Sequence, residues 1–388
     1  MKHGNDAGPI RTAHALAQNP REAAAEFHKQ IMEGEIALVV FFCSSTYDLD
    51  VLGAELKRLF AGVRIVGCTT AGEIGPAGYR EHSISGAGFP ADTCTAVAGY
   101  LGELKRFSIA EGRTFAQKLL EQLEEKSTRP VEGNSFGFMM IDGLSVREEP
   151  VAHVFQEAIS PLPLVGGSAG DDMQFSTTYV YHDGRFRTDG ALLVLITTSL
   201  PFVAFKTQHF IPGEERLVVT EADPARRIVT EINGLTPAKE YARVAGVASD
   251  KLTPDCFANS PVVVLIDGTN YVRSIQKVNP DNSLTFYCAI EEGLVFRVAR
   301  GQDLIGNLKA NFEHLEKKIG PIRFVLGCDC ILRKLEILHS GLRDEVEAIL
   351  RHYNMVGFNT YGEQFYGVHV NQTLTGIAVG TPEEASHE

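Results

Sequence analysis

The segment VGCTTAGEI at residues 66–74 decides how the fold is predicted, because close variants of it return twice in the chain. Residues 165–172 read VGGSAGDD, and residues 356–363 read VGFNTYGE. Aligned on Val-Gly, each segment has a small polar turn and an acidic residue six positions after the glycine. A phrase that recurs with the same internal spacing indicates a structural repeat with three copies.

The sequence around each turn repeats as well. Upstream of each turn come a helix pattern, an apolar segment typical of a strand and a second helix pattern, and another apolar segment follows the turn. The predicted helices are 21–33, 48–60, 113–125, 146–159, 302–318 and 341–353, and the predicted strands are 37–43, 83–89, 136–141, 191–197, 322–326 and 373–379. This alternation predicts an α/β fold made of three diverged helix–strand–helix–strand–loop–strand repeats.

Residues 200–300 interrupt the repeat pattern. Short alternating segments separated by Gly, Asn and Pro turns predict an inserted antiparallel region there, with one helix at 236–244. We place a boundary between two domains near residues 223 and 224. The predicted organisation is a tail at 1–19, an N-terminal sensory domain at 20–223, a C-terminal domain at 224–380 and a disordered tail at 381–388.

The composition excludes several classes of partner. The 388 residues include 36 basic and 49 acidic side chains, a net charge of −13. A strongly acidic surface repels phosphate backbones and anionic headgroups, so we expect neither nucleic acid nor a membrane surface as a partner. The apolar runs are far shorter than the ~20 residues that cross a bilayer. The seven scattered cysteines predict reduced thiols and, with no apolar leader segment, a cytoplasmic protein.

Four segments together resemble the FIST superfamily of bacterial cytoplasmic sensory proteins, which have a FIST N and a FIST C domain. They are VGCTTAGEI (66–74), PLVGGSAGDD (163–172), RRIVTEINGLTPAKEY (226–241) and GEQFYGVHVNQTLTGIAVG (362–380). Two further segments, IDGLSVREE (141–149) and HVNQTLTG (369–376), are most similar to its haem-binding, nitric-oxide-sensing branch. The resemblance implies a sensor that binds haem b and nitric oxide. It also implies a histidine kinase or cyclic-di-GMP enzyme as the partner, in two-component and biofilm signalling.

The repeated turns are the candidate ligand pocket. A loop at the end of a strand can direct backbone amides and small hydroxyls into a crevice. The predicted pocket residues are Cys68, Thr69, Thr70, Gly166, Gly167, Ser168, Asp172, Asn359, Glu363 and Asn371. Amides and small polar side chains suit a carboxylate or an amine better than a porphyrin. A small metabolite such as an amino acid is therefore the alternative ligand.

The acidic residue of each turn has a simpler predicted role. Glu73, Asp172 and Glu363 stand at the same offset in all three copies, which argues against a dedicated catalytic pair. Side-chain oxygens of Asp and Glu commonly accept bonds from loop amides. We therefore expect these carboxylates to cap their turns.

Haem binding needs an axial donor and cationic partners for the propionates. The chain has no C-x-x-C-H motif, so haem would be held without a covalent bond. His209, on an alternating apolar segment, and His369, beside the third turn, are the two candidate axial ligands. Arg273, Arg297 and Arg300 lie on neighbouring predicted strands, but we expect them to be ordinary surface arginines.

Two further motifs are predicted to be incidental. Gly166–Gly170 matches G-x-S-x-G around Ser168, but a nucleophile elbow requires a helix directly after the serine, and the following sequence is typical of loop and strand. A serine hydrolase is thus the third and least favoured function, and we predict that the chain is not an enzyme. Cys328 and Cys330 are spaced too closely for a metal knuckle, and no second cysteine pair exists.

Overall fold

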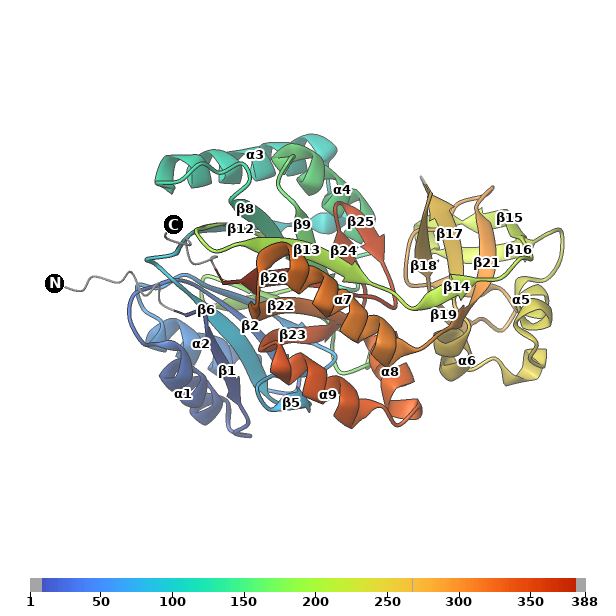
Figure 1. The fold of residues 1–388 in the computed structure, drawn as a ribbon. Helices are drawn as coiled ribbons and strands as arrows, with labels where there is room; N and C mark the ends of the chain where they lie inside the picture. Colours follow the sequence, from blue (N-terminus) through green and yellow to red (C-terminus); the bar gives the residue numbers. More distant parts are fainter. Residues whose placement is uncertain (1–8, 267, 382–388) are drawn as a thin grey trace, which may run out of the picture.

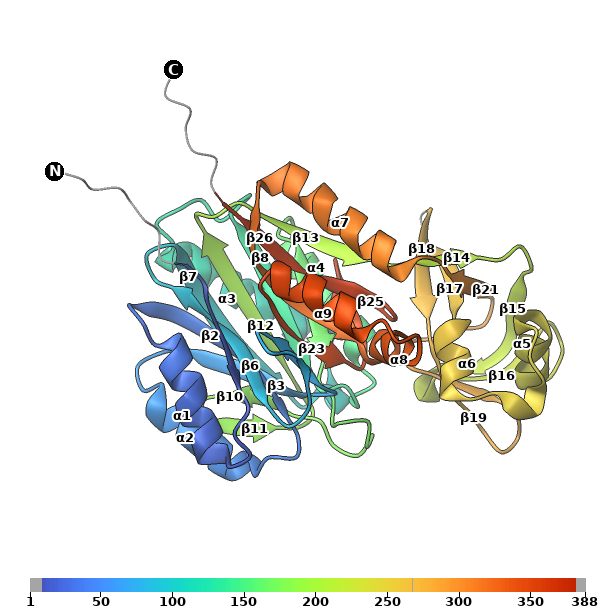
Figure 2. The ribbon, with the colours of Figure 1, turned by 60° about the horizontal axis from the view of Figure 1, so that its bottom comes forward.

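The computed structural model describes residues 9–266 and 268–381, which form four β-sheets flanked by helices (Figure 1). Three sheets have equivalent strand orders and belong to the three copies of the repeat. The fourth is built from residues 210–301 and extends to one side of the three-copy body (Figures 1 and 2). The predicted α/β fold with an inserted antiparallel region is confirmed.

Each copy contains more strands than the sequence predicts. The first copy comprises β1 (Arg11–Ala15), α1 (Pro20–Ile31), β2 (Ile36–Ser44), α2 (Leu49–Leu59), β3 (Ile65–Thr70), β4 (Glu73–Gly75), β5 (Gly78–Arg80) and β6 (Ile84–Pro90). The second comprises β7 (Cys94–Gly102), the short 3-10 turn η1 (Leu104–Arg106), α3 (Ile109–Lys126), β8 (Ser135–Ile141), α4 (Glu148–Ile159), β9 (Leu164–Ser168), β10 (Val180–His182), β11 (Arg185–Arg187) and β12 (Gly190–Thr198). The third comprises β13 (Phe202–Thr207), α7 (Leu304–Ile319), β22 (Ile322–Cys330), α8 (Ile331–His339), α9 (Arg343–His352), β23 (Met355–Thr360), β24 (Glu363–Phe365), β25 (Val368–Val370) and β26 (Leu374–Gly380).

The inserted domain lies between the first strand and the first helix of the third copy. It comprises β14 (Phe210–Pro212), β15 (Leu217–Asp223), η2 (Pro224–Arg226), β16 (Ile228–Ile232), α5 (Pro237–Ala245), η3 (Ser249–Lys251), α6 (Pro254–Asn259), β17 (Val262–Ile266), β18 (Thr269–Arg273), β19 (Ile275–Val278), β20 (Leu284–Phe286) and β21 (Val295–Gly301). All of its strand pairs are antiparallel. The helix expected at 236–244 is present as α5.

A short hairpin from each copy completes the sheet of a different copy. The four main strands of the sheets are ordered β1-β6-β2-β3, β7-β12-β8-β9 and β13-β26-β22-β23. The hairpin β4–β5 of the first copy joins the third sheet, β10–β11 of the second joins the first, and β24–β25 of the third joins the second. Because every copy both donates and accepts a hairpin, the three copies form one interlocked body.

One glycine in each repeated turn is required by strand spacing. Gly67, Gly166 and Gly357 lie on the strand that runs parallel to the central strand of each sheet. A Cβ at these positions would lie 2.4, 2.2 and 1.9 Å, respectively, from a carbonyl oxygen of that central strand. The Val-Gly phrase therefore recurs because the backbones approach too closely for any side chain.

The three sheets share one apolar core on their inner faces. Phe42 of β2 stacks on Phe358 of β23 with ring centroids 4.5 Å apart, and Phe138 of β8 lies 6.3 Å from Phe42. Burying an aromatic side chain of this size contributes roughly 2 kcal/mol. The outer faces are covered by the helices of each copy, as Figure 2 shows for α1 with α2 and for α7 with α9.

One expectation needs correction. Residues 11–15, which we expected to be part of a tail, form β1 and pair with β6. The prediction missed this strand because its five residues, which include Arg, Thr and His, show no alternation of apolar and polar side chains. The third copy is longer than the others because it contains the additional helix α8. Residues 382–388, expected to be disordered, lie outside the described residues. Within the described ranges, no helix is both long and apolar enough to cross a membrane.

Candidate functional site

The three repeated turns meet at the centre of the three-copy body. Thr69, Ser168 and Asn359 occupy the same position in the turns, and the backbone carbonyl of each accepts a bond from the next copy, at 3.0, 3.2 and 2.9 Å. All three side chains are fully buried. The turns therefore converge as the sequence predicts, and they do so as a closed ring of backbone hydrogen bonds.

The other small residues predicted to line the pocket pack against neighbouring strands. Cys68 belongs to the shared apolar core. Gly166 lies against the carbonyl of Met139, and a Cβ on Gly167 would lie 2.6 Å from the methyl group of Thr360. These positions bring the copies into close contact, and their role in ligand binding stays a prediction.

Glu73 closes the turn of the first copy. Its carboxylate accepts bonds from the hydroxyl of Thr70, from the Ser83 hydroxyl at 2.7 Å and from the Ser83 backbone amide at 3.1 Å. The turn and the first residue after the hairpin are thereby held together.

Glu363 makes the same set of bonds in the third copy, with Thr360 and with both the hydroxyl and the amide of Thr373. The capping role predicted for these carboxylates is confirmed for Glu73 and Glu363. Burial raises the pKa of each to about 8, against the opposing effect of the hydroxyl donors.

The second copy departs from this pattern. Its turn is longer, and Val180 takes the strand position of the two glutamates. Asp172 lies in the additional loop, where it accepts bonds from the Ser44 hydroxyl at 2.9 Å and from the amide and hydroxyl of Ser45. The expected equivalence of Asp172 is therefore wrong, because equal spacing in sequence does not survive an insertion in the turn.

Asp142 supplies the missing carboxylate from a different strand end. It follows β8 and accepts bonds from the hydroxyl of Thr178 and from the backbone amide of Asp189, both at 2.5 Å. Asp189 directly precedes β12, as Ser83 directly precedes β6. In every copy a carboxyl group thus accepts a bond from the backbone amide of the residue just before the last strand. In the second copy that carboxyl group comes from Asp142, at a different position in the sequence.

Ser168 is not placed as a nucleophile. No helix follows β9, because residues 169–179 are irregular. The Ser168 hydroxyl accepts a bond from Nε2 of Gln364 at 2.9 Å, and the same amide group lies 3.1 Å from Nδ1 of His369. The amide of Gln364 separates the serine from the imidazole, so His369 does not contact the hydroxyl as a base would.

A second polar cluster, which we call the His369 niche, lies beside this ring of turns and consists of Gly362, Gln364, His369 and Asn371. His369 is on β25, and its imidazole is buried. A Cβ on Gly362 would lie 2.5 Å from Nε2 of His369 and 3.0 Å from Nδ2 of Asn371. The imidazole of His369 and the amide of Asn371 therefore pack directly against the backbone of Gly362, in the volume that any other side chain would occupy.

Several buried atoms of the niche have no hydrogen-bond partner within the described residues. They are Nε2 of His369, Oε1 of Gln364 and Nδ2 of Asn371, with Oδ1 of Asn359 nearby in the ring of turns. Since Gln364 donates to Nδ1 of His369, the ring proton lies on Nε2. Burial lowers the pKa of His369 to about 4, so the imidazole is neutral at pH 7. The niche thus presents donors and an acceptor that nothing satisfies, and each unpaired buried group costs about 1–3 kcal/mol.

Charged residues cover the niche where the inserted domain packs on the three-copy body. Nη1 of Arg273 donates to the backbone oxygen of His369 at 2.6 Å. Arg227 donates to the carboxylates of Glu148 at 2.7 Å and Glu149 at 2.5 Å. The expectation that Arg273 is a surface arginine is wrong, because the docking of β18 against β25 buries it.

Burial and neighbouring charges shift the pKa values of these two glutamates. Burial raises the pKa of Glu148 to about 7, while the Arg227 guanidinium lowers the pKa of Glu149 despite its burial. The amide of Ala289 adds a bond of 2.6 Å to Glu149. The inserted domain is therefore held on the three-copy body by a buried charge network.

The other candidate axial ligand, His209, lies between β13 and β14. Its Nε2 lies 2.7 Å from Oε1 of Glu336, and its ring packs on Phe210 with centroids 4.3 Å apart. The nitrogen that would bind iron is therefore occupied by a carboxylate.

Neither histidine fits haem in this conformation. Haem requires an unprotonated imidazole nitrogen facing an apolar slot. At His369 the free nitrogen carries the proton, faces the backbone of Gly362 and is surrounded by amide side chains. At His209 the nitrogen is engaged by Glu336. Among the described residues there is no group of three or more His, Cys, Asp or Glu side chains that could hold a metal ion.

The Cys-Asp-Cys segment serves the structure. Cys328 and Cys330 are buried, and burial raises the pKa of both thiols. Between them, Asp329 accepts bonds from Arg333 at 2.9 Å and from the Tyr79 hydroxyl at 2.7 Å. The predicted incidental role of the thiols is consistent with these contacts.

The matches to known domains agree with this architecture. The FIST N domain matches residues 37–235, and the FIST C domain matches residues 237–366. The chain belongs to the FIST family. FIST domains are associated with sensing in signal transduction and are typically non-enzymatic, in agreement with the predicted sensory role and with the prediction that this chain is not an enzyme.

The chain is also similar to a distant relative. An uncharacterized protein of Methanocaldococcus jannaschii is 21% identical over 412 aligned positions, which cover 94% of this FIST chain and 78% of that protein. The similarity spans both domains. The predicted boundary at residues 223–224 stays a prediction.

Sequence reasoning missed the residues that complete the niche. Gln364 and Gly362 lie in a segment quoted for the family resemblance, but their role depends on the transfer of the β24–β25 hairpin to the second copy. Glu149 and Arg273 come from other copies or domains. The adjacent pair of glutamates at the start of α4 could have signalled a buried cation.

Proposed function

We propose that this FIST protein is a signal-transduction sensor that binds a small polar metabolite, such as an amino acid, at the His369 niche. The observation that supports this proposal is the set of buried, unpartnered donors and acceptors around Gly362. A native protein rarely leaves such groups unpaired without water or a ligand.

The chemistry of the niche suits a zwitterion. The Nε2–H of His369 and the Nδ2 of Asn371 are hydrogen-bond donors that match a carboxylate. The free Oε1 of Gln364 is an acceptor that matches an ammonium group. Glu149 provides a negative charge close to His369. A ligand with both groups would satisfy atoms that otherwise stay unpaired.

Binding at the niche would be coupled to the inserted domain. Ser274 donates its amide to Oδ1 of Asn371, and Gln372 donates to the backbone oxygen of Ala258 in α6. Since the niche is fully buried, access for a ligand requires these contacts and that of Arg273 to open. The resulting displacement of the inserted domain is the signal, passed to a separate histidine kinase or cyclic-di-GMP enzyme.

The direct test is calorimetry of the purified protein against the twenty amino acids. We expect at least one to release or absorb heat and to raise the Tm. The variant Asn371→Leu should lose that response, since it removes a donor at nearly constant volume. The matched control Asn311→Leu on α7 should keep it.

The absence of both heat and a Tm shift with every amino acid would overturn the metabolite proposal. Haem b with nitric oxide is the competing proposal, which rests on the family resemblance. This proposal predicts a Soret band in the haem-reconstituted protein that shifts with nitric oxide and is lost in His369→Ala or His209→Ala. That result would favour haem over a metabolite as the ligand.

A further inference from the structure

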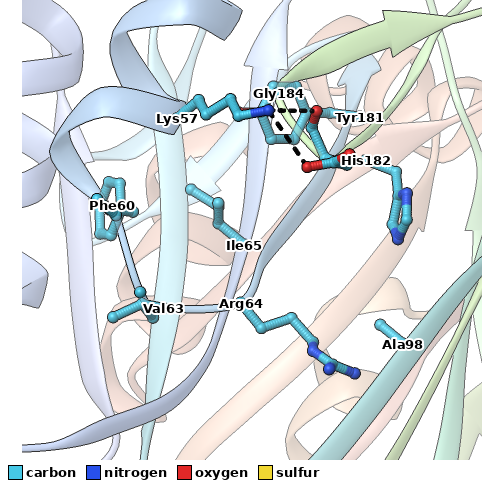
Figure 3. Close-up of a pocket in the computed structure, with 12 residues that line it drawn as sticks. Lys57, Phe60, Val63, Arg64, Ile65, Ala98, Tyr181, His182 and Gly184 are labelled. Atoms are coloured by element: carbon cyan, nitrogen blue, oxygen red, sulfur yellow. Dashed lines mark hydrogen bonds and ion pairs between the residues drawn. The ribbon is translucent and has the colours of Figure 1, made fainter.

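A cavity of about 590 Å³ lies at the junction of the first and second copies, away from the His369 niche. It is bounded by the end of α2, the loop that leads into β3, the β10–β11 hairpin and β7 (Figure 3). Its walls include the apolar side chains of Phe60, Val63, Ile65 and Ala98.

Arg64 extends into this cavity toward Ala98, and the His182 imidazole lies on the same side (Figure 3). Arg64 is partly buried, and its guanidinium makes no hydrogen bond or ion pair with any residue that the structure describes. Burial also lowers the pKa of Arg64, because it removes part of the water that stabilises the charged guanidinium. A partly desolvated arginine without a partner is unfavourable until an anion pairs with it.

The other charged groups around the cavity lie near charges of opposite sign. Arg187 lies over the Tyr100 ring, 4.8 Å from its centroid, and that ring stacks on His182. Asp183 is the acidic residue on the cavity wall, and it pairs with Lys57 at 3.4 Å. Since Lys57 and Asp183 pair with each other, Arg64 is the charged side chain of the cavity wall that has no opposite charge beside it among the described residues.

The repeat provides an internal comparison. Arg64 lies three residues before Gly67, and the equivalent positions in the other copies are Pro163 and Asn354. Asn354 fills its position by accepting a bond of 3.2 Å from Thr12 of β1. Two of the three copies thus have no cation at this position. The repeat therefore folds without one, and the fold does not require Arg64.

We propose that this cavity is a second binding site, for a small organic anion with a phosphate or carboxylate group on a flat apolar ring. The planar guanidinium fork of Arg64 pairs with the anionic group. The partly exposed side chains of Val63, Ile65 and Ala98 contact the ring. The site is separate from the metabolite niche and goes beyond the proposed function.

Calorimetry with phenyl phosphate, benzoate and inorganic phosphate tests the site. We expect phenyl phosphate or benzoate to bind at least tenfold more tightly than inorganic phosphate, because only the ring buries apolar surface. Arg64→Met should weaken that binding tenfold or more, and Arg64→Lys should give an intermediate loss because it keeps the charge but not the fork. Arg185→Met, an exposed arginine on the same hairpin, should bind like the wild type.

Equal affinity of the wild type and Arg64→Met for the ring-bearing anions would overturn the proposal. If inorganic phosphate binds as tightly as phenyl phosphate and benzoate, the site does not recognise an apolar ring, and that part of the proposal is wrong. Circular dichroism and the Tm of each variant show that it is folded, and Asn371→Leu should leave this binding intact. The failure of this site is therefore distinguishable from failure of the His369 niche.

Discussion

At the scale of single residues, burial decides the chemistry of this protein. Glu73 and Glu363 are carboxylates held in a dry environment by hydroxyl and amide donors. Their pKa values of about 8 mean that both are protonated at pH 7 in the folded state. The unfolded chain would ionise them near pH 4.5.

This difference predicts a pH dependence of stability. Because the folded pKa is raised, the stabilising effect is present in full below about pH 4.5 and is lost as the pH rises toward about 8. Each group changes the free energy of unfolding by about 1.4 kcal/mol per pH unit within that window. The double variant Glu73→Gln with Glu363→Gln removes the effect, so its free energy of unfolding should rise by roughly 7 kcal/mol relative to that of the wild type between pH 5 and pH 8.

Urea unfolding at pH 5 and at pH 8 measures this change in the free energy of unfolding. Glu345→Gln, an exposed glutamate of α9, is the control and should follow the wild type. A stability difference between the double variant and the wild type that stays constant with pH would contradict the prediction.

Burial also predicts which thiols react. Six of the seven cysteines are buried, and Cys256 in α6 is partly exposed. Iodoacetamide should therefore modify one thiol per native chain and seven in urea, as measured by mass spectrometry. Cys256→Ser should reduce the native count to zero; rapid modification of further thiols in the folded protein would show that the core opens.

At the scale of elements, the fold depends on close strand pairs and exchanged hairpins. The glycines at positions 67, 166 and 357 allow a parallel strand to lie against the central strand of each sheet. They also position the turn from which each hairpin leaves for the next copy. A change at one glycine thus disturbs two sheets at once.

We predict that Gly357→Ala lowers the free energy of unfolding by about 3 kcal/mol, because the new methyl group would lie 1.9 Å from the Gly327 oxygen. Gly301→Ala is the control, since the nearest heavy atom there is 3.3 Å away, and it should change stability by less than about 1 kcal/mol. Urea unfolding compares the two, and equal losses would show that strand spacing is not the constraint.

At the scale of the whole molecule, one buried charge network joins the inserted domain to the three-copy body. Arg227, with its side chain 8% exposed, bridges Glu148 and Glu149 across the interface. Neither carboxylate has another cation as close among the described ion pairs. The network lies beside the His369 niche, so the stability of the interface and access to the niche depend on the same residues.

Arg227→Met should lower the free energy of unfolding by about 3 kcal/mol, because it leaves two buried carboxylates without their cation. Arg226→Met, at the exposed neighbouring position, should change it by less than about 0.5 kcal/mol. Urea unfolding measures both, and hydrogen exchange at residues 148–149 should increase in the first variant only. The same stability for both variants would contradict the role of the network.

Local patterns predicted much of this fold. The threefold repeat, all six main helix positions within a few residues, the antiparallel insertion and α5 all follow from periodicity and turn residues, which act over short distances. The hairpins were missed because their strands have three residues each, too few to show alternation. The helix α8 was not predicted.

The sequence by itself determined the repeat and the layering of helices on sheets, since these depend on patterns within about 30 residues. The convergence of the three turns joins residues 100 or more positions apart and was decided by the tertiary structure. Only the tertiary structure decided which copy receives each hairpin, why Asp142 replaces Asp172 in the second turn, and how His369 comes to face Gly362 and the inserted domain. Those contacts join residues from distant parts of the chain, and the free energy of such a contact depends on burial and on partners that no local pattern specifies.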